Sequence, residues 1–493
     1  MSAVILHLEV TWVYKESRMV KLLAHRGTAF DTDGNAIVAH TLTSYEFAIN
    51  FGADYVEPDL YITKDGVLVC HHDDIKGGFA NITYAEALKK HPDLATFLEV
   101  IDLVNDKAIE TGRKVGITFE IKEGVTKKAT LDAADKAVAT LADKGFTAPG
   151  RIYVNSFDLD VLKHMHDISF PDYALKFSAG TPSLIKLVKF HEVIWGAIKD
   201  SVPFVSSESA YSHIVNGQVN DFIDGFGVYS QFGTTNTALK KFVKVIHDNG
   251  KEAHAYTAEG NASDNFYSQL IDNGFDAIYV DNSETARKYF DFRNGVTTIH
   301  GDNESNNIIL NSTDQKHTVY AMQGDDKIVS ITDNATIFAD GGDDTIISYG
   351  RNNILNGGGG NDSIYSFGGN NIINGGAGNN KIQLDNSDTL SYDAELQGRD
   401  VVTGNGLISI KNIDFSDISF SSKGNDLVIS FINGGEIFMN GAISDDHTVL
   451  STVMVEDITV DVESQLSYAL VSENIAHHVL ELEVNGVKQT DFG

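Results

Sequence analysis

An apolar residue recurs at every ninth position through part of the second half of the chain, and no other feature constrains the fold as strongly. A glycine stands four residues before most of these positions. A flexible Gly/Asn-rich linker would not keep a branched aliphatic residue at a fixed spacing, so the period predicts a solenoid of stacked repeats. The apolar positions are Leu310, Val319, Ile328, Ile337, Ile346, Leu355, Ile364, Ile373 and Ile382, and the glycines are Gly324, Gly342, Gly360, Gly369 and Gly378.

The clearest unit is GGGGNDSIY, from Gly357 to Tyr365, and it resembles the calcium-binding nonapeptide repeat of RTX proteins. This resemblance implies a parallel β-roll in which each nonapeptide supplies one loop and one short strand. Every second unit then stacks on the same edge of the roll. The resemblance also implies that the third residue of each loop triplet is a carboxylate ligand of calcium, while loop carbonyls complete the coordination shell.

Sorting the loops by edge predicts two edges with different chemistry. On the first edge, the third positions are Asp326, Asp344 and Asp362, followed by Asn380, whose amide would make a weaker site. We therefore expect several Ca²⁺ ions along this edge only, between the loops of successive aspartates. Because stacked aspartates repel one another without the ion, this region should fold only when calcium is near millimolar. The loop glycines expected at these sites are Gly324, Gly342 and Gly360.

The second edge offers no carboxylate at the third position of its loops. We expect hydrogen bonds from asparagine side chains to hold this edge in place of calcium. The triplets are Asp333-Asn334-Ala335, Arg351-Asn352-Asn353 and Gly369-Asn370-Asn371.

Before residue 293, strand-like and helix-like segments alternate. About eight such alternations predict an α/β fold, a parallel (β/α)8 or TIM barrel. No strand is assigned to residues 195–214. Strands are expected at residues 21–25, 54–59, 116–121, 151–155, 173–177, 227–230, 252–256 and 277–281, and helices at 42–50, 97–109, 131–141, 239–248 and 266–272.

These patterns divide the chain into four expected parts. They are an N-terminal strand extension (1–20), the barrel (21–292), the β-roll (293–390) and a β-rich C-terminal cap (391–493). The cap resembles those that follow RTX repeats and carry an uncleaved C-terminal signal. The resemblance therefore implies the type I secretion machinery as a partner and a secreted protein, with periplasmic or cell-surface association as the alternative.

Composition excludes some classes of partner. The 69 acidic and 37 basic residues give a net charge of −32, which argues against nucleic acid and against an anionic membrane surface. No run of 18 or more apolar residues occurs, so no transmembrane segment is expected. The single cysteine, Cys70, excludes a disulfide within the chain.

Side chains that can do chemistry follow the predicted barrel strands, whose carboxyl ends form active sites in such folds. The first strand runs as LLAHRG and ends with His25 and Arg26. Glu57 and Asp59 are two residues apart, so on a strand their carboxylates face the same side and repel each other unless a cation lies between them.

The third predicted strand adds Glu120 and Lys122, again two residues apart. Hard cations prefer oxygen ligands, so the pattern predicts one divalent cation, Ca²⁺ or Mg²⁺, in the barrel. Alone, Glu120 and Lys122 could form a surface ion pair. Because charged residues follow several successive predicted strands, we interpret them together as one site.

At this point the chain resembles the glycerophosphodiester phosphodiesterase family, most closely its bacterial periplasmic type. The matching strings run in the expected order from about residue 22 to residue 285. They are AHRG, the HT at His40 and Thr41, GADYVEPDL, TKDG, the HD at His72 and Asp73, FEIK, SFD, HAYT and FDAIYVDN.

The resemblance implies roles for seven residues. Glu57, Asp59 and Glu120 would bind the metal, His25 and His72 would form the catalytic pair, and Arg26 and Lys122 would contact phosphate oxygens. His72 is preferred over the adjacent His71 because it stands directly before the aspartate. Two departures concern the mouth of the site and hence substrate choice: Ala39 stands where the family usually has a glutamate, and the 28–38 loop looks longer than usual.

The chemistry expected is metal-dependent hydrolysis of glycerophosphodiesters to glycerol 3-phosphate and an alcohol. One imidazole would take a proton from the attacking hydroxyl and the other would give one to the leaving alkoxide. We expect His72 as the acid and His25 as the base, although the sequence leaves this assignment open, and the attacking oxygen could be water or a substrate hydroxyl. The alternatives are a phospholipase D or sphingomyelinase D activity on intact lipids and a non-catalytic calcium-dependent surface protein.

Overall fold

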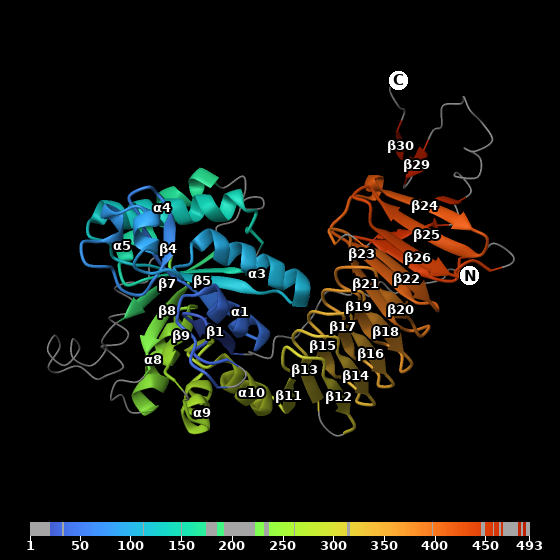
Figure 1. Cartoon of the computed structure of the whole chain (residues 1–493), viewed down its shortest axis with the longest axis horizontal. Coiled ribbons are helices and arrows are strands. Elements are labelled where there is room, and N and C mark those ends of the chain that lie inside the picture. Colours follow the sequence, from blue (N-terminus) through green and yellow to red (C-terminus); the bar gives the residue numbers. More distant parts are fainter. Residues whose placement is uncertain are drawn as a thin grey trace. The chain divides into compact units, whose positions relative to one another are not determined.

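The computed structural model of the chain (Figure 1) describes residues 20–31, 34–111, 113–148, 150–173, 185–191, 222–230, 236–260, 262–312, 316–396, 398–444, 449–456, 458–462, 465–466, 482–484 and 487–489. The N-terminal extension except Val20, and residues 195–214, lie outside these ranges. The chain divides into two compact units, the first Met1–Ala108 with Arg113–Thr298 and the second Ile109–Gly112 with Ile299–Gly493.

Eight described strands of the first unit run parallel and close into the TIM barrel that the sequence predicts. Neighbouring strands pair in the order β2-β1-β10-β9-β8-β7-β6-β5, and β2 also pairs with β5, which closes the ring. Strand β3 (Asp59–Ile62) continues β2 and pairs with β5 and with the short β4 (Leu68–Cys70). The barrel strands are β1 (Lys21–His25), β2 (Tyr55–Glu57), β5 (Gly116–Ile121), β6 (Ile152–Ser156), β7 (Ile185–His191), β8 (Gly225–Tyr229), β9 (Glu252–Ala258) and β10 (Ala277–Val280).

Helices flank the barrel strands (Figure 1), and capping side chains begin most of them. Thr41, Thr126 and Ser263, for example, each accept a hydrogen bond from a backbone N–H of the first helical turn. No described helix is long and apolar enough to span a membrane. The helices are α1 (Leu42–Asn50), α2 (Tyr84–Leu88), α3 (Phe97–Thr111), α4 (Lys127–Asp143), α5 (Leu159–His164), α8 (Asn236–Asp248), α9 (Asp264–Asn273) and α10 (Ser283–Arg293).

Two strand predictions need correction. The strand predicted at 173–177 is wrong at its start, because Tyr173 ends a short 3-10 turn, while residues 174–177 lie outside the described ranges. Strand β7 instead comprises Ile185–His191, between β6 and β8. The parallel pairing of β7 with β6 and β8, which is not local in the sequence, identifies this strand. The strand predicted at 54–59 is interrupted at Pro58, which has no N–H to donate to a ladder.

The second unit is a parallel β-roll, as predicted, in which two sheets face each other across one core (Figure 1). Strands eighteen residues apart pair in register: Ile328 lies beside Ile346, and Ile337 beside Leu355. The apolar residue of every repeat is buried in this core. The repeat strands are β12 (Asn307–Leu310), β13 (Lys316–Tyr320), β14 (Lys327–Ser330), β15 (Thr336–Phe338), β16 (Thr345–Ser348), β17 (Ile354–Asn356), β18 (Ser363–Ser366), β19 (Ile372–Asn374) and β20 (Lys381–Gln383).

Parallel stacking continues past the repeats before antiparallel strands cover the end of the roll. In one sheet, β22 pairs in parallel with β20 and with β26. Strand β25 then pairs antiparallel with β26, and β24 pairs antiparallel with β25. In the other sheet β11 precedes β13, and β21, β23 and β27 continue the stack before the antiparallel β28. These strands are β11 (Val296–His300), β21 (Thr389–Asp393), β22 (Arg399–Thr403), β23 (Leu407–Lys411), β24 (Ile418–Lys423), β25 (Asp426–Phe431), β26 (Glu436–Asn440), β27 (Thr452–Val455) and β28 (Ile458–Val460), with a separate hairpin of β29 (Leu482–Val484) and β30 (Val487–Gln489).

Candidate active site and metal centres

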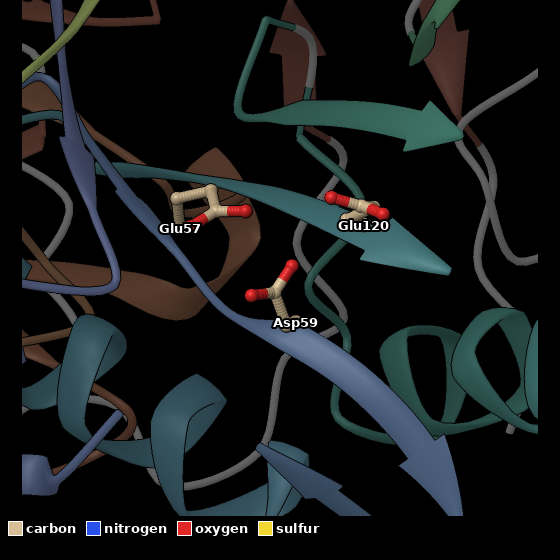
Figure 2. Close-up of side chains that lie close together, drawn as sticks. All are labelled: Glu57, Asp59 and Glu120. Atoms are coloured by element: carbon tan, nitrogen blue, oxygen red, sulfur yellow. The ribbon is translucent and has the colours of Figure 1, made fainter. Parts of the chain in front are cut away.

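Three carboxylates converge at the mouth of the barrel. Glu57 ends β2, Asp59 begins β3, and Glu120 lies on β5 directly beside Asp59 in the strand register. All three side chains are buried, and one oxygen of each lies within 4.8 Å of the others. Figure 2 shows the three carboxylates approaching one another from neighbouring strands. The structure thus brings together the residues that the sequence singles out as metal ligands.

Burial and mutual repulsion disfavour the charged forms of Glu57 and Glu120. Burial and the neighbouring carboxylates raise the pKa of Glu57 well above its ordinary value, and they raise the pKa of Glu120 to about 8. Without a cation, the site therefore retains protons at neutral pH. Buried oxygen ligands that repel one another are the donor set that a hard divalent cation prefers, so the residues present fit Ca²⁺ or Mg²⁺.

Two basic side chains border this cluster. The Nζ atom of Lys122 lies 3.2 Å from Glu120 Oε1 and 3.7 Å from Asp59 Oδ1. The Nε atom of Arg26 lies 3.7 Å from Asp59 Oδ2, and the backbone N–H of Arg26 donates to Glu57 Oε2 (3.0 Å). The predicted phosphate-contacting residues thus lie beside the predicted metal ligands, and their charges partly offset the carboxylates.

Each of the two predicted catalytic histidines has an aspartate next to its Nδ1 atom. His25 Nδ1 donates a hydrogen bond to Asp281 Oδ1 (2.7 Å), whereas His72 Nδ1 lies 2.8 Å from Asp73 Oδ1 as an ion pair. The His72 side chain is 40% exposed, and partial burial, Arg26 and Lys122 lower its pKa. The basic residues at the carboxylate cluster therefore act electrostatically on His72.

The adjacent His71 has different surroundings. Its Nδ1 donates to the backbone carbonyl of Asp73, and its ring packs against Phe79 and His91, with centroid separations of 5.6 and 4.8 Å. This packing gives His71 a structural environment and favours His72 as the site residue.

His40 is part of the site, although the sequence analysis assigned it no role beyond the matching HT string. Its ring is buried, and its Nε2–H donates to Asp59 Oδ2 (3.0 Å) while Nδ1 accepts from the Tyr45 hydroxyl (2.8 Å). Burial lowers the pKa of His40 to about 4, which keeps the ring neutral. Burial alone would raise the pKa of Asp59, but the His40 hydrogen bond and the nearby positive charges hold it below its ordinary value.

Asp281 is the second residue that sequence reasoning missed. It follows β10, the neighbour of β1, and its Oδ2 accepts from the backbone N–H of Gly260 (2.7 Å) while Oδ1 holds His25. The only signal for it was an acidic residue at the end of the last predicted strand, within FDAIYVDN.

Aromatic side chains lie at strand ends away from the carboxylate cluster. Phe157, just beyond β6, contacts Tyr256 of β9 edge to face at 5.9 Å, and Tyr229 of β8 contacts Tyr256 at 5.5 Å. Phe157 and Tyr256 pack on the buried barrel interior. The described part of the mouth therefore has a charged sector, from β10 through β1 to β5, and an aromatic sector on β6, β8 and β9.

The first edge of the roll carries a row of buried aspartates. The Oδ1 atoms of Asp344 and Asp362 accept from the backbone N–H of the aspartate one turn earlier, at 2.7 and 2.8 Å, and Asn306 donates likewise to Asp326. The Oδ2 atom of each of these aspartates is buried without a hydrogen-bond partner among the described residues. Burial raises the pKa of Asp326 and Asp362 to about 7 and that of Asp344 to about 8. These oxygens fit the calcium that the repeats imply.

Glycine is required on this edge because successive turns approach closely. A Cβ atom on Gly342 would lie 2.1 Å from the carbonyl oxygen of Gly324, and one on Gly360 would lie 2.0 Å from that of Gly342. Both glycines have a φ of 137°, in the region that side chains disfavour.

Asparagine side chains hold the second edge, as predicted. Asn353 Oδ1 accepts from the backbone N–H of Ala335, and Asn371 Oδ1 accepts from that of Asn353, both at 2.7 Å. Their amide nitrogens donate to Ser348 and Ser366. At these loops, asparagine oxygens therefore accept the backbone hydrogen bonds that aspartate oxygens accept on the first edge.

Both the barrel and the roll of this chain are similar to known proteins. Residues 347–382 match four copies of the RTX calcium-binding nonapeptide repeat. The chain is 22% identical over 316 residues to a glycerophosphodiester phosphodiesterase from Haemophilus influenzae, a match that covers 52% of this chain and 83% of that protein. It is 26% identical over 155 residues to a glycerophosphodiester phosphodiesterase from Caldanaerobacter subterraneus, covering 28% of this chain and 58% of that protein.

Among solved structures, one similar chain is a phosphodiesterase from Oleispira antarctica in complex with the product sn-glycerol-3-phosphate. It is 18% identical, with a TM-score of 0.39, and the match covers 55% of this chain and 97% of that chain. The sequence model of the glycerophosphoryl diester phosphodiesterase family matches residues 25–285. These residues make up more than half of the sequence, and the chain therefore belongs to the glycerophosphoryl diester phosphodiesterase family.

Proposed function

We propose that this phosphodiesterase hydrolyses glycerophosphodiesters to glycerol 3-phosphate and an alcohol in a reaction that depends on a divalent cation. The observation that carries the proposal is the convergence of Glu57, Asp59 and Glu120 within 4.8 Å. The cluster lies beside Arg26 and Lys122, whose charges suit a phosphodiester anion.

In the proposed site, the basic side chains bind and orient the phosphate. Arg26 and Lys122 contact its non-bridging oxygens and stabilise the negative charge that grows during displacement. A cation bound by the carboxylates supplies further charge stabilisation as a Lewis acid. The aromatic sector of Phe157 and Tyr256 packs against the carbon skeleton of the substrate.

The two histidines move the protons. Asp281 accepts the Nδ1–H of His25, so the Nε2 lone pair of His25 is free to take the proton of the attacking hydroxyl. The attacking oxygen bonds to phosphorus while the bond from phosphorus to the alcohol oxygen breaks. Protonated His72 then gives its proton to the leaving alkoxide. Arg26 and Lys122 lower the pKa of His72, and a bound phosphodiester anion offsets their charges, which favours the protonated form.

We further propose that the enzyme is secreted through the type I machinery and folds its roll with calcium outside the cell. The RTX repeat match and the buried aspartates of the first edge support this proposal. Low calcium inside the cell would keep the roll unfolded until export.

The test measures glycerol 3-phosphate released from several glycerophosphodiesters by wild type, His72→Ala and His71→Ala, with and without chelator. Because general acid catalysis contributes at least about 100-fold, His72→Ala should lose that much kcat while His71→Ala stays within a few-fold. Glu57→Gln removes one proposed ligand of the barrel cation and leaves the calcium sites of the roll unchanged. This variant therefore distinguishes the metal requirement of the barrel from that of the roll. Equal losses in the two histidine variants, or turnover of sphingomyelin but not of glycerophosphocholine, would overturn the proposal.

A further inference from the structure

The row of buried carboxylates on the first edge extends beyond the recognised repeats. Asp400 lies in β22, which pairs in parallel with β20, so its turn stacks directly on the turn that ends at Asn380. The two residues are 20 positions apart, whereas the preceding members are 18 apart. Because of these two extra residues, Asp400 does not fall on the strict nine-residue period. Gly398-Arg399-Asp400 nevertheless repeats the Gly-x-Asp pattern of the earlier triplets.

Asp400 accepts the same backbone hydrogen bond from the preceding turn as the aspartates inside the repeats. Its Oδ1 accepts from the backbone N–H of Asn380 at 3.0 Å and also from the Asn380 side-chain amide. The residue is only 2% exposed, and its Oδ2 has no hydrogen-bond partner among the described residues. Burying a carboxylate oxygen without a partner is costly, so such an atom calls for a ligand.

Asp388, near the same end of the roll but on the second edge, shows that the fold can satisfy a buried carboxylate by itself. Asp388 is 1% exposed, yet its Oδ1 accepts from the backbone N–H of Asn371 (2.8 Å) and its Oδ2 from that of Asp385 (2.7 Å). The difference between Asp388 and Asp400 is therefore one unpaired oxygen, on the edge where Asp326, Asp344 and Asp362 also have one.

We propose that Asp400 is a ligand of a further Ca²⁺ ion, bound between the turn ending at Asn380 and the turn ending at Asp400. Carbonyl oxygens of the glycine-rich 375–380 turn would supply the other ligands, since a hard cation takes several oxygens. The ion also offsets the repulsion between Asp400 and Asp362, whose carboxylates lie near enough to raise the pKa of Asp362.

This ion would join the roll to its cap. Strand β22 pairs on its other side with β26, where Asp400 lies opposite Ile437, and β26 begins the antiparallel part of that sheet. A cation at Asp400 therefore fixes the last parallel turn of this edge to the strands that cover the end of the core. Loss of this ion should expose the capped end of the core before the rest of the roll unfolds.

The test is the number of calcium ions bound per full-length chain, measured by equilibrium dialysis for wild type, Asp400→Asn and Asp388→Asn. Asparagine at position 400 keeps an oxygen that can accept from the Asn380 N–H but removes the carboxylate. We expect Asp400→Asn to bind one ion fewer and to need a several-fold higher calcium concentration to fold, whereas Asp388→Asn keeps the wild-type number. An unchanged number in Asp400→Asn would overturn the proposal.

A second measurement does not require Asp400→Asn to fold. Tyr392 is buried and stacked on Phe431 at 5.1 Å, and the nearby Asp400 carboxylate contributes to raising its pKa after burial. Terbium bound at Asp400 should therefore be sensitised by Tyr392. Tyr392→Phe, which preserves the stacking, should lose part of the tyrosine-sensitised terbium emission of the wild type; equal emission from the two proteins would contradict a site at Asp400.

Discussion

The barrel and the roll both bury groups of carboxylates, but they differ in what surrounds them. In the barrel, Lys122 lies 3.2 Å from Glu120 and Arg26 lies near Asp59, so positive side chains partly compensate the cluster. In the roll, Asp326, Asp344, Asp362 and Asp400 each keep one carboxylate oxygen without a hydrogen-bond partner, and none of these four forms an ion pair within the described part of the chain. From this difference we expect a cation to serve chemistry in the barrel and folding in the roll, because among the described residues basic side chains accompany the barrel carboxylates but not these aspartates.

Removal of calcium should produce the largest difference between the two units. With chelator at pH 8, we expect the roll to lose its β-structure while the barrel remains folded, because barrel side chains compensate part of its charge. Circular dichroism and a two-transition thermal melt of the full chain measure this. Loss of both transitions together would show that the barrel depends on its cation as much as the roll does.

The pH should shift the stability of the calcium-free roll in a direction opposite to ordinary acid denaturation. The pKa of Asp344 is about 8 and those of Asp326 and Asp362 are about 7 in the folded roll, whereas an unfolded aspartate has a pKa of about 3.9. The folded roll therefore binds protons that the unfolded chain has released. This contribution to stability is complete below about pH 4 and is lost as the pH rises through about 8.

Urea denaturation in EDTA at pH 5.5 and pH 8 checks this sign, with the roll expected to be more stable at pH 5.5. The matched control is Asp344→Asn, which removes one titrating group and should reduce the difference between the two pH values. A calcium-free roll that becomes more stable toward pH 8 would contradict the assignment.

A smaller effect is expected where a neutral residue positions a barrel carboxylate. His40→Ala removes the donor to Asp59 Oδ2, and loss of such an outer partner typically lowers metal affinity by about 10- to 100-fold. Tyr45→Phe removes only the next contact and should cost less. Calorimetric titration of the metal provides the measurement, and the roll should keep its calcium number in both variants. Metal affinity unchanged in His40→Ala would mean that Asp59 needs no such support.

The smallest expected effect concerns the edge of the roll where we expect no ion. Asn353→Ala leaves the buried N–H of Ala335 without its acceptor, which should lower the free energy of unfolding by about 1–3 kcal/mol. Calcium-saturated denaturation measures this, and the calcium number should stay constant. A change in that number would show that the two edges are not independent.

Sequence-based prediction succeeded where the relevant contacts follow from a short local period. The nine-residue spacing places Ile328, Ile346 and Ile364 in one buried column because each turn of the roll adds the same number of residues. The alternation of strands and helices likewise predicts a barrel, and the carboxyl end of a strand predicts where Glu57, Asp59 and Glu120 meet. The prediction missed β7 because the pairing with β6 and β8 that defines this strand is not local in the sequence.

The chain by itself therefore determined the two architectures, the stacking register of the repeats and the side chains that gather at the barrel mouth. Only the tertiary structure decided that His25 is held by Asp281, 256 residues away, that His40 supports Asp59, and that Asp400 continues the row after an irregular turn. The physical reason is that a periodic pattern specifies which face of an element is buried, whereas these partners meet only after the barrel closes and the roll stacks, at separations that no local pattern records.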